Sequence, residues 1–305
     1  MQTLNDFLKK KDITQELQSI FCHIALAAKK ISASICTSDM EKRLAQNCTG
    51  DTQSKLDTAA DKIIATELIR AKFVFQCASE EQEKSQFCNK NGTYFVAYDP
   101  YDGGTVGDCN ITFGSIFGIW RKKDIISARA KDGLVAACYI LYGPRVTFTL
   151  AIAKKGVHTF ELRNDGQFLL TKENQKVAKN AKHFAPGNLK ACNNNPQYKK
   201  VVDYWIASGK RLRYTGALVT DINHIICKGD GIFCYPKDRE HPSGRLRLLY
   251  EGAPLAFLLL EAGGVGYTQD NKKILDIAVK NYHQRTTLFM GSRDEVQRVL
   301  KMMKS

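Results

Sequence analysis

The residues best able to do chemistry in this sequence are acidic, although acidic residues are its minority charge. They occur in short motifs with turn-forming neighbours: Asp51 and Asp57 in GDTQSKLD, Glu80 and Glu81 in SEEQE, Asp99 and Asp102 in DPYDGGT, and Glu251 in LRLLYEGAP. Carboxylates brought together would repel one another unless a hard divalent cation lay among them, and an all-oxygen donor set favours Mg²⁺ or Mn²⁺ over zinc. The pattern predicts a cation site, with ordinary surface turns as the alternative.

The DPYDGGT motif is the most informative of these segments. Pro100 fixes its own φ and favours an extended Asp99, so that the carboxylates of Asp99 and Asp102 can face one point across a tight turn. The next two residues, Gly103 and Gly104, leave backbone N–H groups open to an anionic oxygen. The motif therefore suits a phosphate held beside a cation.

Arginines and tyrosines form a second group of candidates. They lie in RLRYTG, IFCYP and GRLRLLYE: Arg211, Arg213, Tyr214, Tyr235, Arg245 and Arg247. Forked guanidinium donors and phenol hydroxyls are suited to holding a phosphate. Taken singly, each is more often a solvated strand residue.

Helices and strands must alternate to position these groups. Apolar spacing predicts an amphipathic helix within residues 4–35 with Asp12 as an N-cap, and a second helix over residues 55–69. Strands are expected at residues 73–77, 93–98, 110–120, 145–153 and 159–162, and further helix and strand patterns follow residue 200. The carboxylate motifs fall where predicted strands end, which is where α/β sheets bind ligands. The polar stretch 163–200 favours a boundary near residue 180, with an N-terminal α/β domain, 1–180, carrying most of the carboxylates and a C-terminal α/β domain, 181–305.

The net charge of the chain indicates which kinds of molecule it could bind. With 45 Lys+Arg and 31 Asp+Glu, the chain carries +14, which indicates nucleic acid, an anionic membrane or a phosphorylated small molecule. The basic residues are dispersed and no nucleic-acid-binding motif occurs. The longest apolar run, residues 134–142, is too short to span a membrane. A small anion is therefore favoured, with no nucleic acid and no membrane. The ten cysteines include no C-x-x-C pair, so most are expected to be buried hydrophobes in a reducing compartment.

Taken together and in order, these motifs resemble the fructose-1,6-bisphosphatase and sedoheptulose-1,7-bisphosphatase family of metal-dependent sugar phosphatases. The resemblance covers nearly the whole chain: GDTQSKLD, SEE, DPYDGGTVGDCNITFGSIFGIW, RYTGALVTDIN, GIFCYP and GRLRLLYEGAPLAFLLLEAGG. It implies an α/β fold, an αβαβα five-layer sandwich. It also implies a phosphoric monoester hydrolase with two or three Mg²⁺ ions, or Mn²⁺, that cleaves the C1 phosphate ester of a sugar bisphosphate.

The resemblance also implies roles for individual residues. The metal ligands would be Glu80, Asp99, the carbonyl of Tyr101, Asp102 and Glu251. The residues that orient and deprotonate the attacking water would be Asp51, Asp57 and Glu81. The substrate would be held by Gly103, Gly104 and Thr105 at the scissile phosphate, by Arg245 at the sugar, and by Asn188, Arg213, Tyr214, Tyr235 and Arg247 at the distal phosphate. Arg213 would reach in from a neighbouring subunit of a homodimer or homotetramer.

Several positions depart from the family pattern. Gly104 stands where Ser is usual, and Arg245 where Lys is usual, which exchanges a compact ammonium for a planar guanidinium. The Thr-Gly-Glu loop that holds AMP in many relatives is missing, and Cys48 lacks the nearby partner of the thioredoxin-regulated plastid enzymes. Inhibition by AMP and thioredoxin control of that type are therefore not expected.

The choice of sugar rests on further motifs. FAPGNLKACNNNPQY, YGPRV and LRYTGALVTDINHIIC resemble the sedoheptulose branch more closely than the fructose branch. The expected reaction converts sedoheptulose 1,7-bisphosphate into sedoheptulose 7-phosphate and phosphate. Fructose-1,6-bisphosphatase or dual activity is the alternative, because the two sugars differ by one hydroxymethylene. A basic nucleic-acid-binding protein and a degenerate sugar-phosphate sensor are more remote.

Targeting signals are sparse in this sequence. It shows no transit pattern, and its end, KMMKS, is not the peroxisomal Ser-Lys-Leu address. A cytoplasmic location is therefore expected, with a peroxisome-like organelle or a plastid as alternatives if targeting segments were trimmed.

Overall fold

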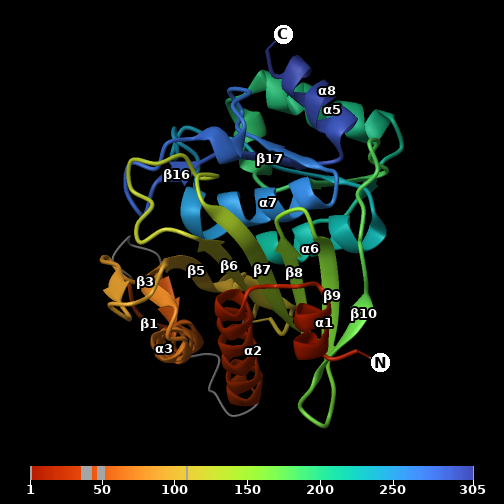
Figure 1. Cartoon of the computed structure of the whole chain (residues 1–305). Helices are drawn as coiled ribbons and strands as arrows, with labels where there is room; N and C mark the ends of the chain where they lie inside the picture. Colours follow the sequence, from red (N-terminus) through yellow and green to blue (C-terminus); the bar gives the residue numbers. More distant parts are fainter. Residues whose placement is uncertain (1, 36–42, 47–51, 108, 305) are drawn as a thin grey trace.

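Two β-sheets and the helices around them form five layers in the computed structural model, which describes residues 2–35, 43–46, 52–107 and 109–304 (Figure 1). The layers alternate in the order helix, sheet, helix, sheet, helix, because each sheet buries an apolar surface on both faces. This is the α/β architecture expected from the sequence. Among the described residues, no helix is both long and apolar enough to cross a membrane.

The first sheet carries the acidic loops. In spatial order its eight strands are β10 (Phe168–Lys172), β9 (Gly156–Leu162), β8 (Thr147–Ile152), β7 (Leu134–Tyr142), β6 (Phe113–Trp120), β5 (Tyr94–Asp102), β3 (Val74–Ser79) and β4 (Gln86–Phe87). Strands β3 and β5 are parallel, and the other neighbouring strands are antiparallel. The C-terminal ends of β3 and β5 therefore lie at the same edge of the sheet, as α/β ligand sites require.

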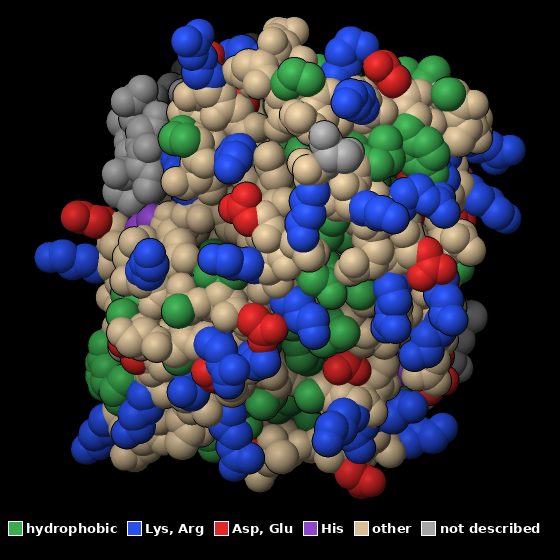
Figure 2. Space-filling model, turned by 90° about the horizontal axis from the view of Figure 1, so that it is seen from above, with side chains coloured by type: hydrophobic (Ala, Val, Ile, Leu, Met, Phe, Trp, Pro, Cys, Tyr) green, Lys and Arg blue, Asp and Glu red, His purple; other side chains and the backbone are tan. Residues whose placement is uncertain are grey.

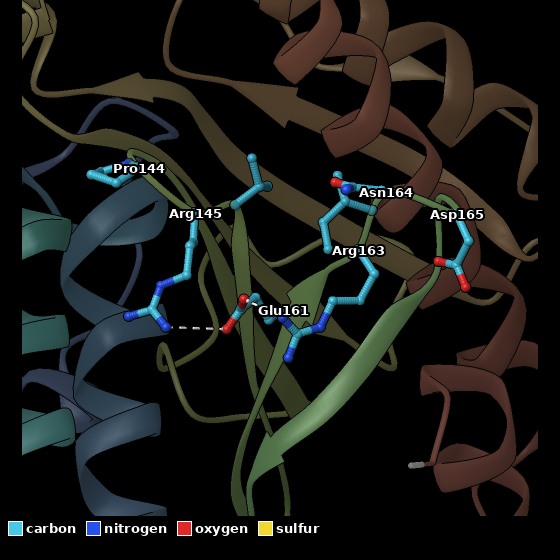
Figure 3. A pocket seen from close by; sticks show the side chains of 8 residues that line it. Pro144, Arg145, Glu161, Arg163, Asn164 and Asp165 are labelled. Carbon is cyan, nitrogen blue, oxygen red and sulfur yellow. Dashed lines mark hydrogen bonds and ion pairs between the residues drawn. The ribbon is translucent and has the colours of Figure 1, made fainter.

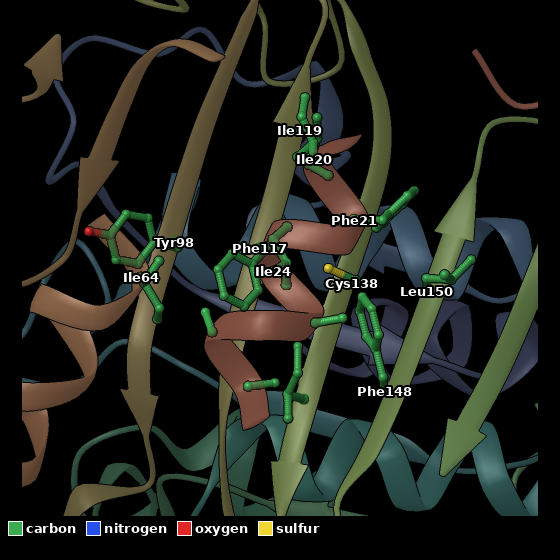
Figure 4. Packing of buried hydrophobic residues seen from close by; sticks show 14 of the residues in the cluster. Ile20, Phe21, Ile24, Ile64, Tyr98, Phe117, Ile119, Cys138, Phe148 and Leu150 are labelled. Carbon is green, nitrogen blue, oxygen red and sulfur yellow. The ribbon is translucent and has the colours of Figure 1, made fainter. Parts of the chain in front are cut away.

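Three N-terminal helices cover one face of this sheet: α1 (Leu4–Lys10), α2 (Gln15–Ile35) and α3 (Lys55–Arg70). Helix α2 turns Ile20, Phe21 and Ile24 toward Phe117 and Phe148 of the sheet, and each of these side chains is at most 1% exposed (Figure 4). The apolar spacing read from the sequence is thus the packing face of α2.

The single helix predicted within residues 4–35 is instead two helices. Asp12, predicted as an N-cap, has a left-handed φ of 52° in the turn between α1 and α2. The Oγ1 of Thr14 accepts a hydrogen bond from the backbone N–H of Leu17 at 3.5 Å, so Thr14 caps α2 and the Asp12 assignment is wrong.

The second sheet belongs to the C-terminal part of the chain. Its strands follow the order β12 (Arg211–Leu212), β11 (His183–Pro186), β13 (Ile232–Tyr235), β17 (Leu288–Gly291) and β15 (Val265–Tyr267). Between the two sheets lie α6 (Leu218–Lys228), the π turn η2 (Leu248–Gly252) and α7 (Ala253–Glu261). The outer layer holds α5 (Pro196–Ala207), α8 (Arg293–Met302) and the 3-10 turn η1 (Leu189–Asn193).

Short elements complete the chain. They are the strand pairs β1 (Arg43–Gln46) with β2 (Thr52–Ser54) and β14 (Leu246–Arg247) with β16 (Arg285–Thr286), the short helix α4 (Gly104–Gly107) and the 3-10 turn η3 (Ile274–Asp276). On the face seen in Figure 2, Lys and Arg side chains are spread widely, with acidic side chains between them. The positive charge on this face therefore forms no continuous stripe of the kind that tracks a nucleic-acid backbone.

Candidate active site

Three buried carboxylates converge at the edge of the first sheet. Asp99 and Asp102 lie at the C-terminal end of β5, and Glu251 lies on η2. One oxygen from each lies within 4.8 Å of the others, and the three residues are 5%, 9% and 5% exposed. The structure thus brings together carboxylates separated by about half of the chain.

Burial and mutual repulsion change the acidity of this group. Burial raises the pKa of Asp102 to about 7, although the N–H of Val219 donates to its Oδ2 at 2.7 Å and opposes the shift. Burial and the Asp102 charge raise the pKa of Glu251 to about 8. The pKa of Asp99 is also raised, by burial and then by Glu80, Asp102 and Glu251. Buried carboxylates with raised pKa values bind either protons or a cation that lies among them.

The predicted water-activating residues lie on two other elements. Asp57 is in the first turn of α3 and is 7% exposed, while Glu81 is half-buried in the turn after β3, next to the predicted metal ligand Glu80. The N–H of Glu80 donates to the carbonyl of Tyr98 on β5 at 3.1 Å, which holds this turn beside the Asp99 loop. Asp51 lies outside the described residues, as does Cys48.

Several residues that the sequence did not single out hold this turn in place. The Nε2 of Gln82 donates to Asp61 at 2.7 Å, and Asp61 also accepts from the hydroxyl of Tyr98 at 2.9 Å. On the other side, Nε2 of His283 lies 2.9 Å from the carbonyl of Gln82. Asp61 lies four residues after Asp57 on the same face of α3, a spacing that could have indicated it. His283 is 201 residues away from Gln82, so no local signal marks it.

The loop after Asp102 is shaped by close packing. Gly103 has φ of +95°, and a Cβ there would lie 2.5 Å from the Cβ of Ala217, so glycine is required. A Cβ at Gly104 would lie 3.1 Å from the Tyr101 ring and 3.8 Å from Oδ1 of Asp57. The Tyr101 ring therefore crowds the position at which Ser is expected from the resemblance. Thr105 follows on α4 and is exposed.

The predicted sugar-phosphate residues lie at the ends of strands in the second sheet. Asn188 follows β11, is 7% exposed, and donates through Nδ2 to Asp238 at 2.7 Å. The hydroxyl of Tyr214 donates to the carbonyl of Gly187 at 2.9 Å, and Tyr235 ends β13. Because β11 and β13 are parallel, these groups share one edge of the sheet.

Electrostatic coupling links this edge to the acidic group. Burial raises the pKa of Tyr214 to about 12, and the charges of Arg245 and Asp102 also act on its phenol, as does Tyr235. Arg247 is 2% exposed, lies 3.8 Å from Glu80 through its Nε, and donates its backbone N–H to Glu251. Arg213 is exposed beside the edge strand β12 and donates to the carbonyl of Leu212 at 2.7 Å, so within this chain it does not point into the group.

A cavity of about 610 Å³ lies away from this site, between the turn after β7 and the turn joining β9 to β10. Figure 3 shows Arg145 and Arg163 there on either side of Glu161, to which they donate at 3.5 and 2.8 Å. Its cations are thus already paired with a carboxylate.

A second cavity, of about 620 Å³, borders β16 and the loop after β15. It is lined by five basic residues, Lys237, Lys272, Lys273, Lys280 and Arg285, and by Asp270 and Asp276. This basic surface adjoins the β14–β16 pair that carries Arg247.

Comparison with known proteins places these features in a family. The family described as "Fructose-1-6-bisphosphatase, N-terminal domain" matches residues 2–173, and its C-terminal counterpart matches residues 177–304. The class 1 fructose-1,6-bisphosphatase of Pelobacter propionicus is 36% identical over 98% of this chain and 92% of its own. That of Campylobacter concisus is 37% identical over 92% of this chain and 96% of its own.

Two solved structures share the fold over the full length. One is a Toxoplasma gondii protein assigned as a sedoheptulose-1,7 bisphosphatase, and the other is the holo form of Leishmania major fructose-1,6-bisphosphatase. Each has a TM-score of 0.92 and 30% sequence identity, and each alignment covers 100% of this chain and 99% of the other. The similarity thus extends to relatives named for both sugars.

Proposed function

Because this chain belongs to the fructose-1,6-bisphosphatase family, a family of sugar bisphosphatases that are metal-dependent phosphoric monoester hydrolases, we propose that it hydrolyses the C1 phosphate ester of sedoheptulose 1,7-bisphosphate. The observation that carries the proposed chemistry is the buried group formed by Asp99, Asp102 and Glu251. The products are sedoheptulose 7-phosphate and inorganic phosphate.

The donor set at this group fits a hard divalent cation. All three donors are carboxylates, they are buried, and burial and nearby carboxylates raise their pKa values despite the opposing charges of Arg247 and Arg245 at Glu251. Together with Glu80 and the carbonyl of Tyr101, they would hold two or three Mg²⁺ ions. Such ions, when bound, lower the pKa of water and stabilise charge on the phosphoryl group.

The chain's own groups supply orientation and proton transfer. Glu81 and Asp57, on separate elements beside the Asp99 loop, accept the proton of the attacking water, and Asp51 is the third residue of this proposed set. The backbone of Gly103, Gly104 and Thr105 binds the scissile phosphate. Asp57 is suited to a role here because its Oδ1 lies beside Gly104.

The distal phosphate is bound at the edge of the second sheet. Asn188, Tyr214, Tyr235 and Arg247 supply amide, phenol and guanidinium donors, and Arg245 contacts the sugar. Arg213 completes this set from a neighbouring subunit, which agrees with its exposure beside the edge strand β12. A homodimer or homotetramer is therefore part of the proposal.

Fructose 1,6-bisphosphate is the second candidate substrate. The similar curated relatives are named fructose-1,6-bisphosphatases, whereas the PGNLKA, YGPRV and LRYTGALVTDIN segments favour the seven-carbon sugar. Tyr214 of LRYTG donates to the carbonyl of Gly187 in PGNLKA, and Asn188 of PGNLKA donates to Asp238 in the segment after β13. These two motifs therefore lie together where we propose that the sugar phosphate binds.

Kinetics with both sugars test the proposal. Purified protein is assayed for phosphate release from each bisphosphate over a range of Mg²⁺ concentrations, and kcat/KM is compared. A higher kcat/KM for sedoheptulose 1,7-bisphosphate is expected. A preference for fructose 1,6-bisphosphate would overturn the seven-carbon assignment and leave the phosphatase chemistry standing. Activity that persists in excess EDTA would overturn the metal role.

A further inference from the structure

Two cysteines are in contact in the hairpin that carries Glu80 and Glu81. Cys77 is on β3 and is 1% exposed, and Cys88 is half-buried just after β4. Their sulfurs are 3.6 Å apart. Among the described residues, this is the thiol pair that the fold brings into contact.

The strand register explains the contact. Cys77 pairs with Gln86 across the antiparallel β3–β4 ladder, so Cys88 occupies the diagonal position on the same face. Both thiols pack against the core beneath α1, α2 and α3. The N–H of Cys88 donates to the carbonyl of Phe75 at 2.9 Å, which holds the end of the hairpin against β3.

The segment between the two cysteines contains part of the proposed metal centre. Glu80 and Glu81 follow Cys77 by three and four residues. Their turn is held by bonds from Glu81 N–H to the Ser79 hydroxyl at 3.2 Å and from Gln82 N–H to the Ser79 carbonyl at 3.3 Å. A covalent bond between the thiols would therefore close a loop around these carboxylates.

We propose that Cys77 and Cys88 form a reversible disulfide that displaces the Glu80–Glu81 turn and weakens metal binding. The link to metal rests on the proposed role of Glu80 as a ligand, whereas the disulfide itself does not. This pair is distinct from Cys48, whose sequence context led us to expect no thioredoxin control.

A small disulfide such as oxidised glutathione can oxidise the two thiols by thiol–disulfide exchange. The thiolate of Cys88, the more accessible sulfur, attacks the glutathione disulfide and releases one glutathione thiolate. The thiolate of Cys77 then attacks the Cys88 sulfur of the mixed disulfide and releases the second. Two protein thiols are oxidised, one disulfide is reduced to two glutathiones, and the two protons pass from the protein to the glutathione thiolates.

The surroundings of the thiols agree with this order of attack. Contact with the Cys77 thiol lowers the pKa of Cys88, whereas the same contact and burial raise the pKa of Cys77. Cys88 is also the less buried of the two cysteines, so an external disulfide reaches it first.

Geometry indicates a labile bond rather than a structural one. Diagonal residues of an antiparallel pair have Cα atoms about 7 to 8 Å apart, while disulfides usually need less than about 7 Å. We therefore expect bond formation to strain the pairing of β3 with β4, and strained disulfides are the readily reduced, regulatory ones. Because β4 is a two-residue strand at the sheet edge, it is the element that can move.

Peptide mapping tests the bond directly. The full-length protein is incubated with oxidised glutathione, alkylated and digested without reductant. We expect a linked peptide pair containing Cys77 and Cys88, which disappears after treatment with dithiothreitol. Recovery of both cysteines as unlinked alkylated residues would overturn the proposal.

Metal binding tests the consequence. Mn²⁺ titration calorimetry and the Mg²⁺ dependence of phosphatase activity are measured on reduced and oxidised protein. Oxidation is expected to raise the dissociation constant by about 10- to 100-fold, as when a residue supporting a metal ligand is lost. A disulfide that forms without changing metal affinity would overturn the switch.

Two variants separate this pair from other thiols. Cys88→Ser should fold normally, keep the reduced protein's activity and lose the response to oxidised glutathione. Cys109→Ser, which removes an exposed thiol in the loop after α4, should keep the response. The opposite pattern would assign the effect to Cys109. If reduced wild-type protein shows no Mg²⁺-dependent activity, the proposed function fails, while the mapping still decides the disulfide.

Discussion

The edges of the two sheets that carry the candidate site residues differ in burial and in hydrogen bonding. At the edge of the first sheet, Asp99, Asp102 and Glu251 are buried and already lie together, and burial and nearby carboxylates raise the pKa of each. At the edge of the second sheet, Asn188 and Tyr214 are hydrogen-bonded to groups of the same chain, and Arg213 is exposed.

This difference between the two edges indicates that the acidic edge is the preorganised part of the proposed site. The acidic edge is built from rigid strand ends and a π turn between two layers, so its geometry exists before any ligand binds. Under the proposed function, the second edge would exchange internal hydrogen bonds for contacts with a phosphate, and Arg213 would come from a neighbouring subunit. We therefore expect changes at the first edge to affect catalysis and metal binding, and changes at the second to affect substrate affinity.

The substitution Asp102→Asn should have the largest effect, and it tests whether the acidic edge carries out catalysis. The amide oxygen can still accept from the Val219 N–H, so the fold should persist, but the charge that we propose holds the metal is lost. Metal stabilisation of the transferring group is worth several kcal/mol, which corresponds to a loss in kcat of about 10³-fold or more. The rate of phosphate release at saturating substrate measures this loss in kcat. Near-normal activity would remove the proposed centre, and Asp203→Asn, on the surface of α5, is the matched control.

The substitution His283→Phe tests whether the first edge depends on distant support. It keeps an aromatic ring against Tyr250 and removes the hydrogen bond to the Gln82 carbonyl. The Mg²⁺ concentration for half-maximal activity should rise by about tenfold, the lower end of the usual effect of losing a supporting residue. His283→Gln retains a donor and should restore much of the affinity. Equal defects in both variants would indicate a packing role only.

The second edge is tested by Tyr214→Phe. Removing one hydroxyl should raise KM by about 2- to 10-fold, because a hydrogen bond contributes about 0.5 to 1.5 kcal/mol. The same variant should leave kcat and the Mg²⁺ dependence nearly unchanged. Tyr204→Phe, on α5, is the control. A fall in kcat without a change in KM would place Tyr214 with the catalytic edge and contradict the comparison.

The residues at each edge could be predicted from the sequence only where the pattern that marks them lies within a few neighbouring positions. The turn chemistry of DPYDGGT and the strands that flank it were readable because Pro, Gly and alternating apolar residues act within a few positions. Convergence of Glu251 with Asp99 and Asp102 is a long-range contact, and the family resemblance rather than periodicity led us to expect it.

Supporting contacts could not be read in this way. The bonds from Gln82 to Asp61 and from His283 to Gln82 join segments far apart in the chain, and neither His nor Gln has a spacing that marks such a role. The break between α1 and α2 was missed for a related reason, because the same apolar period continues on both sides of Asp12. Local pattern thus identified the acidic motifs and five of the eight strands of the first sheet, whereas tertiary contacts decided what holds them.

Protonation offers the finest test of the contrast between the edges. In unfolded chains Asp and Glu have pKa values of about 3.9 and 4.3, whereas burial raises those of Asp102 and Glu251 to about 7 and 8 in the fold. Between pH 4 and 8 the folded metal-free protein therefore binds more protons than the unfolded chain, and its stability falls as pH rises. In EDTA, Tm should be a few degrees lower at pH 8 than at pH 5.5, and Mg²⁺ should raise Tm more at pH 8. Tyr214, with a pKa of about 12, does not titrate in this range, so Tyr214→Phe should keep the pH dependence while Asp102→Asn reduces it. A metal-free Tm that rises between pH 5.5 and 8 would show that the acidic edge is not the strained one.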